Sequence, residues 1–443
     1  MAKGPFEDTT AGSGLPTAPV DQFTRPVQQF LRIEALSGIV LAVCTLIALG
    51  AANSAYFPSW QAFWDQELSI GVGGWSIVHP LWYWVNDALM VIFFFVVGLE
   101  IKRELVEGHL ADRRTLLLPV AAAFGGAAVP ALIFFALQHG TPGERGWAVP
   151  MATDIAFVVG CLALLGARVP TGLKIFVLSL AIVDDLIAVL VIALFYAKKF
   201  EGLWLVGALA FTVVVVLLQK LGVRRLGVYW ILGAALWFCM LQSGVHPTVA
   251  GVVLGVLTPV KPWVKRASIR EVIGHTVAAL DEAEVTKVRP HLALERLAFA
   301  AREARSPLER LEDRLHPWVS FAVMPIFALA NAAVPMSAAG FEDPLALATA
   351  GALVVGKPIG IVLSSFLVVK LGLASLPRGV NFAALVGAGV LSGTGFTMSL
   401  FIASLSFEGE QLDAARMGIL VGSGAAIAVG MAILVGVLKK PAR

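Results

Sequence analysis

Twelve apolar runs of roughly 20 residues follow one another along this 443-residue chain. A helix needs about 20 apolar residues to cross the hydrocarbon core of a bilayer. Charged residues make up only 14% of the chain, too few to cover a water-soluble protein of this length. The sequence therefore predicts an all-α polytopic membrane protein with about 12 transmembrane helices. The spans are expected near residues 31–53, 82–101, 115–137, 148–166, 171–197, 203–220, 227–242, 246–260, 315–335, 345–370, 381–407 and 412–438.

Lysine and arginine residues are concentrated in alternate loops, and this distribution predicts the orientation of the chain. If the amino terminus is cytoplasmic, the outside loops contain only Arg145, Lys198 and Lys199. Cytoplasmic loops carry the excess of basic residues in membrane proteins, so both termini are predicted to be cytoplasmic. The same distribution explains the net charge of +3 without a nucleic-acid partner, and it leaves the lipid bilayer as the expected surrounding.

The segments outside the spans are the two ends of the chain and two long loops. Residues 1–29 contain no apolar run of a signal peptide and are predicted to be a disordered cytoplasmic tail, with a second short cytoplasmic tail at residues 439–443. Residues 54–81 are predicted to form an outside loop with an interfacial hairpin. Residues 261–314 are predicted to be a cytoplasmic loop containing an amphipathic helix, which is either simply solvated or regulatory. The membrane part then comprises residues 30–260, with spans 1–8, and residues 315–438, with spans 9–12.

Spans 4 and 11 both contain residues that should interrupt a helix. Pro150 precedes the polar pair Thr153 and Asp154 in span 4, and the string GVLSGTG occurs in span 11. Interrupted helices leave backbone N–H and C=O groups unpaired, with partial positive and negative charges at their ends. In transporters, interrupted segments in both halves indicate the binding site. Asp154 and Lys357, an isolated base in an apolar run, are the candidates to neutralise these ends.

Three aspartates, Asp154, Asp184 and Asp185, lie deep inside apolar runs, where each unpaired acid costs about 3 kcal/mol. Neighbouring helical residues point about 100° apart, so Asp184 and Asp185 are expected to have different roles. Carboxylate oxygens suit Na⁺ or Li⁺, and a carboxyl group removed from water also binds a proton more tightly. Competition between Na⁺ and H⁺ for the same oxygens, combined with alternating access, would produce exchange. The alternative, in which the acids are structural and Lys357 only neutralises one of them, remains open.

Other functional classes account for less of this pattern. Residues 351–357 match GxxxxGK, but Pro358 stands where a phosphate-binding loop needs Ser or Thr, so no nucleotide is expected. The three cysteines lie far apart in apolar runs and indicate neither a disulfide framework nor a zinc site, and no cofactor is predicted. An intramembrane aspartyl protease would pair two of the aspartates but leave Lys357 without a role, so an enzyme is not predicted. A sodium-coupled symporter would keep the Na⁺ site and add an organic substrate.

Seven strings distributed along the chain are similar to sequences of a known family. They are VNDALMVIFFFVVGLEIKREL at 85–105, ATDIAFVVGCLALLGARVP at 152–170, LAIVDDLIAVLVIALFY at 180–196, SGVHPTVAG at 243–251, LHPWV at 315–319, VGKPIGI at 355–361 and GFTMSLFIASLSF at 395–407. These strings resemble the NhaA-type sodium/proton antiporters of bacteria, over roughly residues 30–438. The resemblance implies inverted repeats in which two discontinuous spans, 4 and 11, cross. It also implies an electrogenic, pH-regulated antiporter of the bacterial inner membrane, which exchanges cytoplasmic Na⁺ or Li⁺ for external H⁺ and forms homodimers through its outside hairpin.

The resemblance further implies roles for individual residues in the membrane. Asp185 matches the central ligand of the cation and proton site, and Asp184 matches the acid that pairs with the lysine at Lys357. Asp154, with Thr153 beside it, matches the residue that balances the helix dipoles where the broken spans cross. Asp184 and Asp185 are therefore the expected Na⁺ ligands, within a cation- and proton-binding group that also includes Asp154 and Thr153.

Other matching residues lie away from these acids. Asp87 matches a structurally important acid of span 2, and His246 matches a histidine that either functions or only packs. Glu100 and Glu104 lie four apart on one helix face at the cytoplasmic mouth, where they either attract cations or are ordinary interfacial acids. The chain departs from the family pattern at Asp313, where a histidine is expected, and in its longer cytoplasmic loop and amino-terminal tail. A cytoplasmic cluster linked to pH response is implied at Glu100, Glu104, Glu312 and His316.

Overall fold

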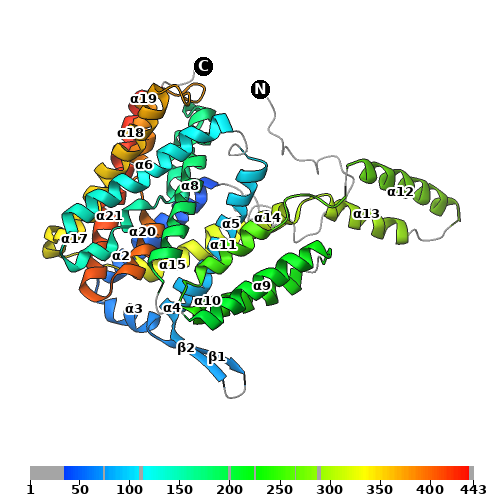
Figure 1. Cartoon of the computed structure of the whole chain (residues 1–443), viewed down its shortest axis with the longest axis horizontal. Helices are drawn as coiled ribbons and strands as arrows, with labels where there is room; N and C mark the ends of the chain where they lie inside the picture. The colour runs from blue at the N-terminus through cyan, green and yellow to red at the C-terminus, as the bar shows by residue number, and fades with distance from the viewer. Residues whose placement is uncertain are drawn as a thin grey trace.

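The computed structural model describes residues 34–72, 75–108, 113–197, 201–223, 226–264, 266–286 and 291–438. Figure 1 shows a bundle of helices from which two hairpins project. One hairpin consists of strands β1 (Glu67–Val72) and β2 (Trp75–Pro80), and the other of helices α12 (Arg266–Thr286) and α13 (His291–Glu303). The predicted tails at residues 1–29 and 439–443 lie outside the described residues.

Helices and short helical turns coincide with each of the twelve predicted spans. The first part of the chain forms α2 (Glu34–Ala52), α3 (Phe57–Trp64), α4 (Leu81–Trp84), η1 (Val85–Leu89), α5 (Met90–Val106), α6 (Arg113–Gln138), η3 (Pro142–Gly146), η4 (Val149–Met151), α7 (Ile155–Leu165), η5 (Gly166–Arg168), α8 (Thr171–Phe195), α9 (Gly202–Lys220), α10 (Leu226–Ser243) and α11 (Thr248–Leu257). After α12 and α13 follow α14 (Pro307–Trp318), η6 (Val319–Val323), α15 (Met324–Asn331), α16 (Ala338–Glu342), α17 (Pro344–Gly351), η7 (Ala352–Gly356), α18 (Lys357–Lys370), α19 (Phe382–Leu391), α20 (Phe396–Ser406) and α21 (Gly409–Val437). The turns η1, η6 and η7 are π-helical, and η3, η4 and η5 are 3₁₀-helical.

Fewer than twelve helices of the described residues are long and apolar enough to cross a membrane. Among the described residues, seven helical segments are long and apolar enough to cross a membrane, or up to nine if two bent helix pairs are each one span. The helices α10 and α11 are apolar but shorter than a bilayer core requires. The structure is therefore that of a mostly helical polytopic membrane protein, and the count of twelve spans stays a prediction.

The predicted outside hairpin is preceded by a short helix. The chain turns by 117° between α2 and α3. The strands β1 and β2 then pair antiparallel, with Glu67 opposite Pro80 and Val72 opposite Trp75. The hairpin extends away from the helix bundle at the lower edge of Figure 1, so its outer edges are accessible to a partner.

Small residues allow the helices around the candidate site to approach closely. The helix α5 packs extensively on α11, and α6 on α18. A Cβ atom placed on Gly98 of α5 would lie only 2.8 Å from the carbonyl oxygen of Val252 in α11. Glycine therefore permits a backbone-to-backbone contact at this crossing, as is common between membrane helices.

Candidate functional site

The first interruption lies in the fourth predicted span. The turn η4 ends at Met151, Ala152 to Asp154 are not helical, and α7 begins at Ile155. Asp154 occupies the N-cap position of α7, where its Oδ1 atom accepts a hydrogen bond of 3.3 Å from the backbone N–H of Phe157. A carboxylate at this position satisfies an unpaired N–H group and faces the positive end of the helix.

The second interruption lies in the eleventh predicted span and is in contact with the first. The helix α19 ends at Leu391 and α20 begins at Phe396. The backbone N–H of Asp154 donates a 2.7 Å hydrogen bond to the carbonyl oxygen of Thr394, and Thr153 Oγ1 donates a 3.2 Å bond to that of Ser392. The two segments of unwound backbone, more than 230 residues apart in the sequence, thus satisfy part of each other's hydrogen-bonding capacity.

The carboxylate of Asp154 caps two helices at once. Besides capping α7, its Oδ2 atom accepts hydrogen bonds from the backbone N–H of Thr397, at 3.1 Å, and from the Thr397 hydroxyl. Thr397 is the second residue of α20, so the acid lies between the N-terminal ends of both helices. Asp154 is 1% exposed, and its negative charge is placed where two partial positive charges meet.

Lys357 contacts the opposite kind of helix end, the carbonyl end of η4, through its side chain. It is the first residue of α18, directly after the π-helical turn η7. Its Nζ atom donates a hydrogen bond to the carbonyl oxygen of Met151, the last residue of η4, and lies 3.0 Å from Asp184 Oδ2. Both side chains of this ion pair are 0% exposed. The lysine therefore neutralises a carbonyl end and a carboxylate together.

Asp184 and Asp185 have different surroundings on α8. Asp184 Oδ2 is held by Lys357 and by Thr153 Oγ1, whose single hydroxyl proton is shared between this 2.6 Å contact and the longer one to Ser392. The Oδ1 atoms of Asp184 and Asp185 are buried and have no hydrogen-bond partner among the described residues. Buried carboxylate oxygens without protein partners are costly unless a proton, water or a cation satisfies them. The arrangement therefore suits the reversible binding of an ion.

Two of the residues predicted to take part in the pH response, Glu104 and Glu312, lie on α5 and α14, which pack on each other. Arg103 Nη1 of α5 is 2.5 Å from Glu312 Oε1 of α14. Burial raises the pKa of the Glu312 carboxyl above its ordinary value, although Arg103 opposes this shift. Glu104 is also buried on α5, one residue after Arg103. Asp313, the residue that departs from the family pattern, is exposed and pairs with Arg305 instead.

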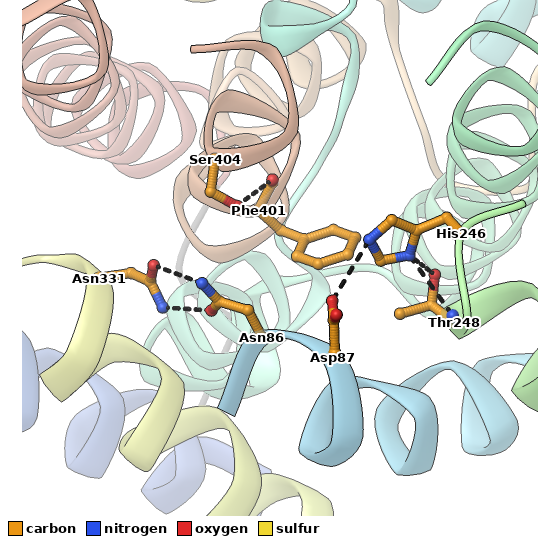
Figure 2. A network of polar contacts seen from close by, with 7 residues as sticks. All are labelled: Asn86, Asp87, His246, Thr248, Asn331, Phe401 and Ser404. Atoms are coloured by element: carbon orange, nitrogen blue, oxygen red, sulfur yellow. Dashed lines mark hydrogen bonds and ion pairs between the residues drawn. The ribbon is translucent and has the colours of Figure 1, made fainter. Parts of the chain in front are cut away.

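Asp87 and His246 lie in a separate polar network, shown in Figure 2. Asp87 belongs to the π-helical turn η1, and its Oδ1 atom is 3.5 Å from His246 Nε2. The other ring nitrogen of His246 shares a 2.7 Å hydrogen bond with Thr248 Oγ1 at the start of α11. The rings of His246 and Phe401 also form a T-shaped contact, with centroids 5.4 Å apart. The network joins η1, α11 and α20.

The sequence pattern did not single out several polar residues that the structure places in these networks. Thr397 is the second partner of Asp154, and Asn86 and Asn331 exchange side-chain hydrogen bonds of 2.8 and 3.4 Å (Figure 2). Arg416 of α21 donates a 3.2 Å bond to Asn331. Their position as polar residues inside apolar runs was the signal that could have identified them. No spacing rule indicates which of these side chains contact each other.

Comparisons with known proteins give one consistent family. A family model described as Na⁺/H⁺ antiporter 1 matches residues 28–434. The Na⁺/H⁺ antiporter NhaA of Rhodopirellula baltica is 47% identical over 431 residues, which cover 97% of this chain and 98% of that protein. The NhaA of Rhizobium meliloti is 47% identical over 426 residues, covering 95% and 97%, and NhaA 2 of Vibrio vulnificus is 44% identical over 421 residues, covering 95% and 94%. The resemblance to NhaA-type antiporters is thereby confirmed, and this protein belongs to the Na⁺/H⁺ antiporter 1 family.

Proposed function

We propose that this protein exchanges Na⁺ for H⁺ across a membrane through Asp184 and Asp185. One observation supports this function most directly: two adjacent acids in a membrane helix each have a buried carboxylate oxygen without a protein partner among the described residues. These oxygens lie on α8, which the bond from Thr153 to Asp184 joins to the two helix interruptions. A carboxylate satisfied by H⁺ cannot also hold Na⁺, so the loading of one ion releases the other.

The contacts of the two acids support a division of roles. Asp184 is already held through its Oδ2 atom by Lys357 and Thr153, although its Oδ1 atom, like that of Asp185, has no partner among the described residues. Asp185 is therefore proposed as the central ligand for Na⁺ and H⁺, and Asp184 as the second ligand. Lys357 compensates the negative charge of Asp184 when no cation is bound. Asp154, with both of its oxygens bonded to helix ends, stabilises the interrupted helices around the ion.

The finer properties proposed here rest on family membership together with features of this chain. They are transport of Li⁺ besides Na⁺, electrogenic exchange of more H⁺ than Na⁺, export of cytoplasmic Na⁺ driven by external H⁺, and regulation by pH through Glu100, Glu104, Glu312 and His316. The contact between the two interruptions supports inverted repeats with crossing spans and alternating access. The projecting β1–β2 hairpin supports a homodimer, and the asymmetry of basic loops supports cytoplasmic termini in a bacterial inner membrane.

The test is exchange measured in everted membrane vesicles. Addition of Na⁺ should dissipate an established pH gradient, as reported by the fluorescence of a pH-sensitive dye. Asp185→Asn should reduce this signal to background, whereas Asp65→Asn, at an exposed position, should leave it unchanged. Exchange should also weaken as the medium becomes acidic, because H⁺ occupies the oxygens that bind Na⁺. Full exchange by Asp185→Asn would exclude the proposed site.

The same vesicles separate the proposal from its rivals. A symporter would require an organic solute, so Na⁺-dependent H⁺ movement in its absence argues for exchange. The protease alternative needs two acids that share a proton. The pairing of Asp184 with Lys357 and the capping role of Asp154 instead commit these two acids to other partners.

A further inference from the structure

Thr394 has an unusual side chain in the second helix interruption. It is 0% exposed, and its Oγ1 atom has no hydrogen-bond partner among the described residues. Buried hydroxyl groups almost always have a partner, and other buried threonines here do. Thr153 bonds Asp184, Thr397 bonds Asp154, and Thr349 donates a 2.7 Å bond to the carbonyl oxygen of Leu345. The unsatisfied hydroxyl of Thr394 therefore calls for a ligand from outside the chain.

The backbone contacts of the interruption place Thr394 next to Asp154 and link its segment to Asp184. Its carbonyl oxygen accepts the 2.7 Å hydrogen bond from the N–H of Asp154. Two residues earlier, the carbonyl oxygen of Ser392 accepts a bond from Thr153 Oγ1, which is also bonded to Asp184. Thr394 thus lies in the same unwound backbone that is connected to Asp184 through a single side chain.

The neighbours of Thr394 hold it firmly. A Cβ atom on Gly393 would lie 2.5 Å from the carbonyl oxygen of Leu353, and one on Gly395 would lie 3.0 Å from Leu353 Cδ2. Both glycines therefore pack against η7 without space for a side chain. In the sequence Gly393–Thr394–Gly395, only Thr394 has a polar side chain. A ligand fixed by tight packing on both sides is already organised for binding.

We propose that Thr394 Oγ1 is a further ligand of the transported Na⁺, together with Asp184 Oδ1 and Asp185 Oδ1. All three oxygens are buried and lack protein partners among the described residues, and oxygens of unwound helices commonly replace the hydration shell of Na⁺ in transporters. The hydroxyl differs from the carboxylates because it is neutral and does not take up a proton in the physiological range. It therefore strengthens Na⁺ binding without strengthening the competing binding of H⁺.

This inference rests on the proposed function, and the experiment separates the two. Exchange is measured in everted vesicles for the parent and for Thr394→Val, which removes the hydroxyl while keeping the shape of the side chain. The KM for Na⁺ should rise about three- to tenfold, the loss expected for one neutral hydrogen-bonding group. The maximal rate should change little, and Thr394→Ser should restore the KM. Li⁺ is smaller and needs fewer oxygen ligands, so its KM should rise less than that for Na⁺.

Thr349→Val is the matched control, because Thr349 is equally buried but its hydroxyl has a backbone partner. Its KM for Na⁺ should equal that of the parent. A second measurement is the rise in unfolding temperature that Na⁺ causes in the purified protein, which reports binding whether or not transport occurs. This rise should require a higher Na⁺ concentration in Thr394→Val.

The possible results are distinct. An unchanged KM and an unchanged Na⁺ dependence of the unfolding temperature in Thr394→Val would overturn the ligand role, as would a loss of maximal rate alone. Failure of Thr394→Ser to restore the KM would also overturn it. If the parent itself shows no Na⁺-dependent H⁺ movement, the proposed function fails, and the shift in unfolding temperature still decides whether Thr394 binds Na⁺.

Discussion

At the scale of single residues, the neighbouring acids Asp184 and Asp185 are distinguished by the direction in which α8 presents them. A rotation of about 100° between successive residues brings Asp184 into contact with Lys357 and Thr153, and these two contacts do not include Asp185. The pair of Asp184 and Lys357 is fully buried, so each charge depends on the other. Removing one partner should therefore cost more than removing both.

This dependence gives a prediction about stability. Lys357→Met should lower the free energy of unfolding by about 3–5 kcal/mol, because it leaves a buried carboxylate without its cation. The double variant with Asp184→Asn should regain most of that loss. Both are measured by thermal unfolding of the purified protein in detergent. Lys370→Met, at the exposed end of the same helix, is the control and should change stability little. A double variant no more stable than Lys357→Met would contradict the pairing.

At the scale of helices, the contact between α5 and α14 includes a titratable group, Glu312. Burial raises the pKa of Glu312, whereas Arg103 lowers it and the nearby Asp313 raises it further. A carboxyl that binds its proton more tightly in the folded protein stabilises the fold at low pH. That contribution is lost as the pH rises through the pKa of the folded state. The contribution of Glu312 to the stability of the folded protein should thus decrease with increasing pH.

Two variants test the direction of this pH dependence of stability. Glu312→Gln resembles the protonated acid and should flatten the dependence of the unfolding temperature on pH, measured between about pH 5 and pH 9. Arg103→Gln removes the opposing charge and should move the loss of stability to higher pH. Glu295→Gln, on the exposed surface of α13, should leave the profile unchanged. The assignment is wrong if Glu312→Gln keeps the pH profile of the parent.

At the scale of the whole molecule, α12 and α13 form a helical hairpin that lies between α11 and α14 in the sequence, called the insertion below. The two helices pack chiefly on each other and project to one side in Figure 1. Their ends are adjacent, because the backbone N–H of Val264 donates a 3.2 Å hydrogen bond to the carbonyl oxygen of Glu303. A segment whose ends lie this close can be removed without pulling on the elements that it connects.

Excision of the insertion decides between the two interpretations of the cytoplasmic loop. Residues 266–299 are replaced by a flexible linker of about four Gly and Ser residues. The unfolding temperature, the KM for Na⁺ and the pH profile of exchange should all remain near those of the parent, as for a simply solvated hairpin. A shift of the pH profile with unchanged stability would instead assign the insertion a regulatory role.

The sequence alone determined the environment and the kinds of residue at the site. Apolar runs of bilayer length required membrane helices, and acids, a lysine and helix-breaking residues within them required partners, because hydrocarbon supplies none. The sequence also indicated where the interruptions at Asp154 and near Thr394 would fall, since proline, glycine and polar residues weaken a helix locally.

Only the tertiary structure decided which of these residues meet. The double capping by Asp154, the contact of Lys357 with Met151 and Asp184, and the partners Thr397 and Asn331 all join segments distant in the sequence. Helical periodicity defines faces within one helix, but it does not define which face of another helix lies opposite. That the hydroxyl of Thr394 has no partner among the described residues is likewise invisible in the sequence, because a missing hydrogen bond is a property of the surrounding packing.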